Sequence, residues 1–229
     1  MGRSGEPSAA RPSPFELRDA VRRELAATER AIREHRYLEA LEAGDIEAES
    51  LAAFAGEQYS ILSSDRRSFA HLAARFPEGP SGDFFLAMAA GESKALAHLA
   101  AFAAALGLDE KRLRAYEPKP ASQAYTAFVA WLALNGSRSD VALAFLVNLA
   151  AWGANCARMA AALRSRYGLD EAAVALFEFF VPPEGFEERA LAVAEAGLAA
   201  GDSPERARRS ARLLQAYELM YWDALAEGL

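Results

Sequence analysis

The stretch SDVALAFLVNLAAWGANCARMAAALRSRYG, residues 139–168, contains one of the longest apolar segments of the chain. Ser139 and Asp140 are residue types that cap the N-termini of helices, and Gly168 is the residue type that most often follows a helix. Between them, apolar residues recur at spacings of three and four rather than two, which is the period of an α-helix. The stretch therefore predicts one long and very apolar helix.

The composition extends this prediction to the whole chain. Alanine takes 54 of the 229 positions, whereas Val, Ile and Thr together take only 12. Alanine is the strongest helix former, and β-branched residues are the ones that pleated sheets prefer. We therefore predict an all-α protein, whose length allows a core without disulfides or structural metal.

Charge and cysteine content indicate which partners are disfavoured and which cellular compartment to expect. The chain has 25 Lys and Arg against 32 Asp and Glu, a net charge of −7, which disfavours nucleic acid and anionic membranes as partners. Its single cysteine cannot form an internal disulfide, and the first twenty residues lack the apolar core of a signal peptide, so we expect a cytoplasmic protein. The apolar stretches around residues 95–108 and 141–154 are too short or too interrupted to predict a membrane span.

Proline, glycine and capping residues divide the chain into helices. Residues 1–12 are small and polar and are predicted to be a disordered tail, and residues 13–229 a single helical domain. Because the connections are short, we expect a compact bundle of mostly antiparallel neighbours. The predicted helices cover about residues 14–41, 45–76, 83–107, 121–134, 140–167, 170–181, 184–200 and 204–227, with a short helical turn at 109–117.

Polar residues on the apolar faces of these helices are the candidates for a site, because each must find a partner or a ligand there. Glu218 lies within the apolar face of the last helix, Glu92 within that of the 83–107 helix, and Tyr125 points inward from the 121–134 helix. We expect such side chains to converge on a pocket between the helices. The other inward polar or aromatic residues are Gln58 and Asp65, with Tyr59 at the edge of their face, and Asn148, Trp152 and Asn155.

A buried polar residue is also common without any site. One inward side chain often only completes a hydrogen bond in the core, so these residues could pair with one another and bind no ligand. A carboxylate among aromatic rings, in contrast, has a pKa raised by desolvation, which suits general acid and base catalysis. The three histidines lie on different helices with no partner three or four residues away, so we expect no metal site. Cys156 lies in an apolar run and is expected to be an inert core residue.

Two motifs resemble those of a known family. The segments AYTAF at residues 124–128 and YELMYW at residues 217–222 are similar to the A-Y-T-x-F and Y-E-x-x-F-W patterns of the TenA/thiaminase II family, which has the heme oxygenase-like fold. The likeness runs from residues 35–44 through Gln58 and Glu92 to the last helix, nearly the whole chain after the tail. It implies a bundle of about seven or eight helices around a central pocket, assembled as a dimer or tetramer.

The resemblance also implies an activity and its residues. The family hydrolyses thiamin or the aminomethyl-pyrimidine left by thiamin breakdown, with a cysteine nucleophile, a glutamate that handles protons, a tyrosine near the nucleophile and an aspartate that binds the pyrimidine. By resemblance Glu218 matches the glutamate and Tyr125 the tyrosine. Asn148 stands at the cysteine position and Tyr59 at the aspartate position, so those two roles do not match. A further pocket tyrosine corresponds to Phe180 or Val181.

Two functions therefore stay open. One is an enzyme in which Glu218 is the general acid and base for C–N hydrolysis of an aminopyrimidine, with Glu92 as a second carboxylate that helps water attack. The other is a binding or regulatory protein on the same fold, since Asn148 cannot act as a thiolate. Either would take a small planar heteroaromatic ligand, and neither implies a metal or cofactor. The predicted lining of the pocket is Gln58, Tyr59, Glu92, Tyr125, Asn148, Trp152, Phe180 and Glu218.

Overall fold

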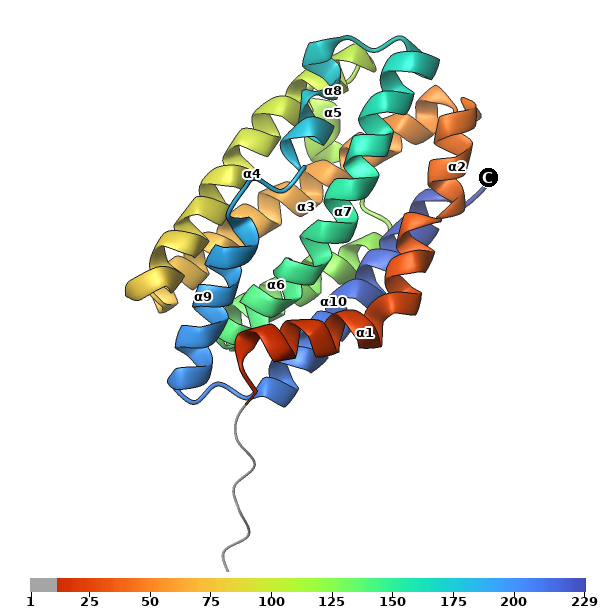
Figure 1. Ribbon diagram of the computed structural model, residues 1–229. Coiled ribbons are helices and arrows are strands. Elements are labelled where there is room, and N and C mark those ends of the chain that lie inside the picture. Colours follow the sequence, from red (N-terminus) through yellow and green to blue (C-terminus); the bar gives the residue numbers. More distant parts are fainter. Residues whose placement is uncertain (1–11) are drawn as a thin grey trace, which may run out of the picture.

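The computed structural model describes residues 12–229, so residues 1–11 of the predicted tail lie outside the described part (Figure 1). The described residues form ten helices and no strand, which confirms the all-α prediction. The helices are α1 (Pro14–Arg33), α2 (Arg36–Ala43), α3 (Ala48–Arg75), α4 (Gly79–Ala105), α5 (Glu110–Ala115), α6 (Pro120–Asn135), α7 (Arg138–Tyr167), α8 (Glu171–Phe179), α9 (Phe186–Ala199) and α10 (Pro204–Leu225).

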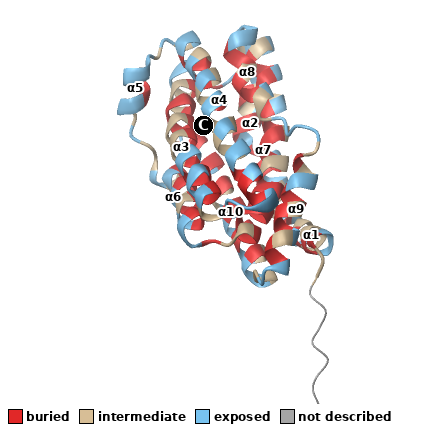
Figure 2. Ribbon diagram, turned by 90° about the vertical axis from the view of Figure 1, so that its left-hand side faces the viewer, coloured by how far each residue is buried: buried red, intermediate tan, exposed pale blue. Residues whose placement is uncertain are grey.

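The long helix α7 runs through the middle of the bundle (Figure 1). It packs against α1, α2, α8, α9 and α10, while α3 packs most extensively against α4 and also against α6. Buried residues line the inward faces of these helices and exposed residues cover the outside (Figure 2). The apolar faces that the sequence pattern predicts therefore pack together into a single core shared by all the long helices.

Helix α7 begins two residues earlier than the sequence predicts, at Arg138 rather than at residue 140. Ser137 is the N-cap, and it exchanges capping-box hydrogen bonds with Asp140, while Gly168 ends the helix in the left-handed conformation at φ 66°. Ser139, predicted to be part of the cap, instead donates its hydroxyl to the carbonyl of Ala194 on α9, 3.0 Å away. Asp140 is therefore the third residue of the helix rather than its cap.

The apolar part of α7 is longer than the sequence suggested. By length and composition this helix could cross a membrane, and no other helix of the described chain meets that criterion. However, 72% of the 18-residue apolar segment within this helix is buried inside the protein. Its hydropathy is therefore explained by its position in the core of the bundle.

The first predicted helix, residues 14–41, is divided in two. Helix α1 ends at Arg33, and α2 begins at Arg36 after His35, whose ring Nδ1 accepts a hydrogen bond from the backbone N–H of Tyr37 at 3.3 Å. The prediction of one helix was wrong because a histidine that caps a helix through its ring carries no recognisable sequence signal.

The starts of α3 and α4 also differ from the prediction. Helix α3 begins after Glu47 rather than at Asp45. Helix α4 begins at Gly79 rather than Asp83, because Pro80 fits the first turn of a helix, where its missing N–H is not needed.

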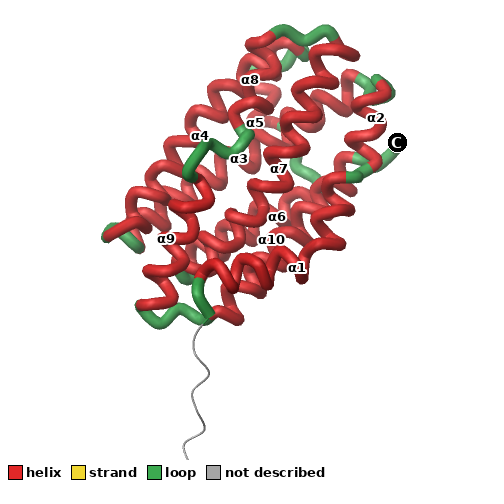
Figure 3. The backbone as a smooth tube through the Cα atoms, in the orientation of Figure 1, coloured by secondary structure: helices red, strands yellow, loops and turns green. Residues whose placement is uncertain are grey.

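The connection from α8 to α9 crosses the middle of the bundle between α4 and α7 (Figure 3). Gly153 of α7 lies directly beneath it, because a Cβ there would be 2.5 Å from Cδ of Pro182 and 2.7 Å from the carbonyl oxygen of Phe180. This close approach brings the connection against the interior of the bundle, where it helps to form the pocket described next.

Candidate functional site

A cavity of about 570 Å³ lies between α3, α4, α6, α7, α10 and the connection from α8 to α9. This volume is within the range of small-molecule sites. The structure brings seven of the eight predicted lining residues to its wall. They are Gln58, Glu92, Tyr125, Asn148, Trp152, Phe180 and Glu218.

Glu218 of α10 is held by hydrogen bonds to both of its carboxyl oxygens. The indole Nε1 of Trp222 donates to Oε1 at 3.2 Å, and Nδ2 of Asn148 donates to Oε2. Only 2% of Glu218 is exposed, and this burial raises the pKa of its carboxyl to about 8, although the hydrogen bond from Trp222 acts in the opposite direction. This raised pKa favours the protonated form of Glu218 at neutral pH, which is the form that can act as a proton donor.

Asn148 of α7 connects Glu218 to Tyr125. The Tyr125 hydroxyl donates to Oδ1 of Asn148 at 3.2 Å, and Nδ2 of Asn148 also donates to Oε1 of Gln215 at 3.1 Å. Burial raises the pKa of Tyr125, and the nearby carboxyl groups raise it further, so this residue stays a neutral phenol. The orientation of the Asn148 amide is thus fixed from both ends.

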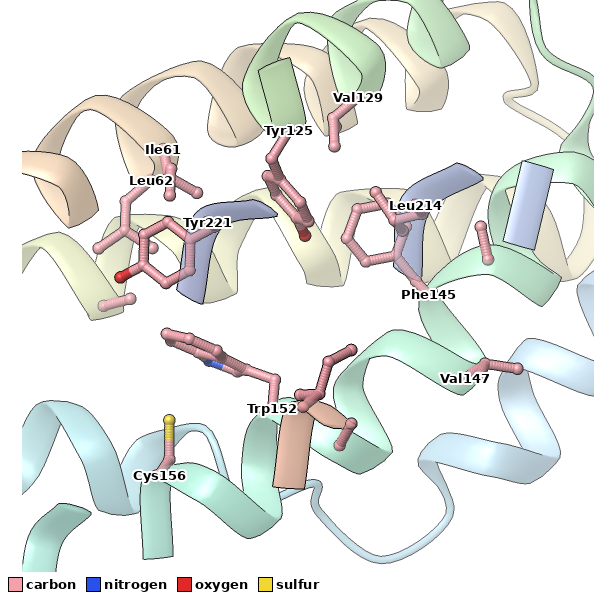
Figure 4. Close-up of a cluster of buried hydrophobic side chains, with 14 of the residues drawn as sticks. Ile61, Leu62, Tyr125, Val129, Phe145, Val147, Trp152, Cys156, Leu214 and Tyr221 are labelled. Carbon is pink, nitrogen blue, oxygen red and sulfur yellow. The ribbon is translucent and has the colours of Figure 1, made fainter. Parts of the chain in front are cut away.

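Aromatic rings form much of the remaining wall. Tyr125 and Tyr221 lie on one side, and Trp152 projects toward them from α7 (Figure 4). The Trp152 ring meets Tyr221 and Phe180 edge to face, at centroid distances of 6.0 and 5.8 Å. Nε2 of Gln58 donates to the Tyr221 hydroxyl at 2.8 Å and so holds that ring in place. Such a wall suits a flat aromatic ligand.

Two further acids line the pocket, Asp65 from α3 and Glu92 from α4. Asp65 lies two helical turns after Gln58, and the Glu92 carboxyl is close enough that the Asp65 charge raises its pKa, in addition to the larger effect of burial. Burial also raises the pKa of Asp65 well above its usual value. Asp65 was missing from the predicted lining, although its seven-residue spacing from Gln58 had already put the two on one helix face.

Tyr59 is the one predicted residue that the structure does not bring to the pocket. Its ring is half-buried and lies beside the guanidinium of Arg114, 5.9 Å from ring centroid to Cζ. Tyr59 is rotated by about 100° from Gln58 around the helix axis, and at this edge of the face its ring turns toward α5 instead of the pocket.

Two other inward residues of α7 serve the core instead. Nδ2 of Asn155 donates to the carbonyl of Ile32 on α1 at 3.1 Å. Cys156 is fully buried, does not line the cavity, and has a thiol pKa raised by burial and by the nearby Glu218. Within residues 12–229, no three His, Cys, Asp or Glu side chains gather as they would around a metal ion.

The bundle of helices around this pocket has the heme oxygenase-like fold, as a structurally similar domain does. Residues 22–227 match the TENA/THI-4/PQQC family, and the chain belongs to that family. The resemblance inferred from the two sequence motifs is therefore confirmed.

Solved structures from three organisms share the fold. A TenA homologue from P. horikoshii OT3 is 18% identical with a TM-score of 0.77, over 93% of this chain and 99% of that one. A domain with a heme oxygenase-like fold from Shewanella denitrificans is 14% identical with a TM-score of 0.72, over 91% and 90%. A protein named a TenA-like thiaminase, from Sulfolobus solfataricus, is 12% identical with a TM-score of 0.67, over 91% and 95%. Among curated proteins, none matches the chain.

Proposed function

We propose that this TenA-family protein hydrolyses the C–N bond of a small aminopyrimidine of the kind released by thiamin breakdown. The observation that carries the proposal is Glu218, a buried acid with both oxygens hydrogen-bonded in the wall of a cavity of about 570 Å³. The structurally similar protein from Sulfolobus solfataricus is named a TenA-like thiaminase, which agrees with this class of reaction.

In the proposed reaction, Glu218 moves the protons. Its carboxylic acid donates a proton to the amine nitrogen as the carbon–nitrogen bond breaks, and ammonia leaves. The carboxylate that results accepts a proton from the water that attacks the same carbon, so an aminomethyl group becomes a hydroxymethyl group and Glu218 is protonated again. A pKa of about 8 suits this exchange, because proton transfer is most efficient when the pKa lies near the working pH.

Asn148 and Trp222 position the Glu218 carboxyl, and Tyr125 positions Asn148 in turn. Glu92 is the second carboxylate predicted to help water attack. We assign proton transfer to Glu218, because it is the acid of the pocket whose two oxygens are both held by hydrogen bonds.

The alternative is a protein that binds the same ligand class without turnover. The observation that favours it is the position of Asn148, which stands in the pocket wall where the family places its cysteine nucleophile, while the only thiol of the chain is outside the pocket. On this alternative the hydrogen bonds of Glu218 serve ligand binding alone.

Release of ammonia from the aminomethyl-pyrimidine distinguishes the two. For an enzyme we expect turnover by the wild type, a loss of about 100-fold or more in Glu218→Gln, and retained ligand binding in that variant. The matched control is Glu195→Gln, which removes an exposed carboxylate on α9 and should leave turnover unchanged. Binding without turnover in any variant would establish the alternative, and neither binding nor turnover would contradict both.

A further inference from the structure

One carboxyl oxygen each of Asp65 and Glu92 is buried without a hydrogen-bond partner in the described chain. Oδ1 of Asp65 and Oε2 of Glu92 are inaccessible to solvent and accept no hydrogen bond, and no ion pair within residues 12–229 reaches either group. Asp65 is only 3% exposed, and Glu92 is half-buried. Buried carboxyl oxygens are normally hydrogen-bonded, since leaving one unsatisfied costs free energy, so two such oxygens in one pocket wall call for an explanation.

The contrast with Glu218 shows that this is not a general property of the pocket. Glu218 of α10 receives a hydrogen bond on each oxygen, the Asn148 amide of α7 is bonded through both its oxygen and its nitrogen, and the Tyr221 hydroxyl of α10 accepts from Gln58. The polar groups that α7 and α10 bring to the pocket are therefore hydrogen-bonded within the protein. The α3 and α4 side leaves acceptor oxygens free to bind something else.

No positively charged side chain of the described residues is paired with Asp65 or Glu92. The other titratable side chains that line the cavity are Glu218 and Tyr221 from α10, Tyr125 from α6, Lys94 from α4 and Arg189 from α9. Lys94 and Arg189 are exposed, and neither forms an ion pair with Asp65 or Glu92. With no protein cation beside them, burial favours the protonated form of both acids, and a cationic ligand would stabilise their ionised form.

We propose that Asp65 and Glu92 form a paired-acid site that binds a flat, positively charged group with at least two N–H donors. An amidinium, or the edge of a protonated aminopyrimidine, has this chemistry: it supplies one donor to each carboxyl, and its planar shape fits beside Tyr125, Tyr221 and Trp152. This inference deepens the proposed function and rests on it only in taking this cavity as the ligand site. It assigns recognition to α3 and α4 and proton transfer to α10.

Benzamidine, benzamide and benzoate test the site, because they have similar shapes and are cationic, neutral and anionic. Isothermal titration of the full chain should show benzamidine binding at least ten-fold more tightly than benzamide, with no binding of benzoate. Asp65→Asn and Glu92→Gln should each weaken benzamidine at least ten-fold. Asp83→Asn, which removes an exposed carboxylate from the same helix as Glu92, should bind like the wild type.

Equal affinities for benzamidine and benzamide, unchanged binding in both acid variants, or no benzamidine binding by the wild type would each overturn the proposal. The two substitutions keep the shape of the side chain and remove a desolvated acid, so each variant should fold. Circular dichroism of each variant checks this. Glu218→Gln separates this inference from the proposed function: it should abolish turnover and keep benzamidine affinity. Benzamidine binding without aminopyrimidine turnover would leave the paired-acid site standing and remove the hydrolase.

Discussion

Asn148 donates a side-chain hydrogen bond to the carboxyl group of Glu218 and so joins the middle of α7 to α10 within the pocket wall. The same amide group is bonded to Gln215, and its oxygen accepts the Tyr125 hydroxyl. One residue thus holds together side chains from three helices. Because all of these groups are buried, the network is costly to interrupt.

Asn148→Ala should therefore destabilise the protein by about 1–3 kcal/mol, because it leaves buried donors and acceptors without partners. It should also raise the pKa of Glu218 further, since one hydrogen bond to the carboxylate is lost. Urea unfolding measures the first effect. Asn135→Ala, which removes an exposed amide bonded only to the carbonyl of Trp131, is the control and should cost less than about 0.5 kcal/mol. Equal losses in the two variants would contradict the buried network.

The protein should become less stable as the pH rises from about 4.5 to about 8. Folding raises the pKa of Glu218 from its usual 4.5 to about 8, so between these values the folded chain holds a proton that the unfolded chain has released. Stability is complete below the unfolded pKa and is lost as the pH passes the folded one, by about 3–5 kcal/mol for this group. Asp65 and Glu92 act in the same direction.

Urea unfolding at pH 5 and pH 8 checks this dependence. The difference between the two pH values should be clearly smaller in Glu218→Gln than in the wild type, with a residual slope from Asp65 and Glu92. An identical slope in both proteins would show that Glu218 is not the source.

Two neighbouring residues of α3 should respond differently to truncation. Gln58→Ala removes the hydrogen bond to Tyr221 and opens the pocket wall, so ligand affinity should fall about five- to ten-fold or more. Tyr59→Ala, one residue later, removes a ring that lies beside Arg114 outside the pocket, so affinity should stay within about two-fold of the wild type. Calorimetric titration with benzamidine compares them, and a larger effect of Tyr59→Ala would place the wrong face of α3 toward the ligand.

A similar contrast holds for two helical glycines. Gly153→Ala should destabilise the protein by about 1–3 kcal/mol and reduce ligand affinity, because its Cβ would push Pro182 and Phe180 away from α7. Gly91→Ala on α4 should stabilise it by up to about 1 kcal/mol, because its Cβ would meet nothing closer than Cζ of Phe179 at 4.0 Å and alanine favours a helix. Thermal unfolding measures both, and a stabilising Gly153→Ala would mean that the α8–α9 connection does not lie on α7.

Local sequence signals predicted the helices and most of the pocket, because apolar periodicity determines which face of a helix is buried. Glu218, Glu92 and Asn148 were found as polar residues within apolar faces, and all three line the cavity. Tyr59 was misplaced because a residue at the edge of a face can turn either way, and only the packing of α5 beside α3 decides. Asp65 was seen on the right face but not assigned to the pocket, since its pairing with Glu92 depends on how α3 and α4 meet.

The thiol of Cys156 gives the final prediction, because it separates the carboxylate mechanism from one that uses a cysteine. Its Sγ lies one turn beyond Trp152 on α7, buried and outside the pocket lining (Figure 4). Burial and the nearby Glu218 raise the thiol pKa, so the thiolate that a nucleophile requires is scarce at neutral pH. Cys156→Ala should therefore keep turnover within about two-fold, and iodoacetamide at pH 8 should label the wild type only after unfolding. Loss of turnover in a folded Cys156→Ala, together with rapid labelling of the native protein, would instead make the thiol the nucleophile and Glu218 its proton donor.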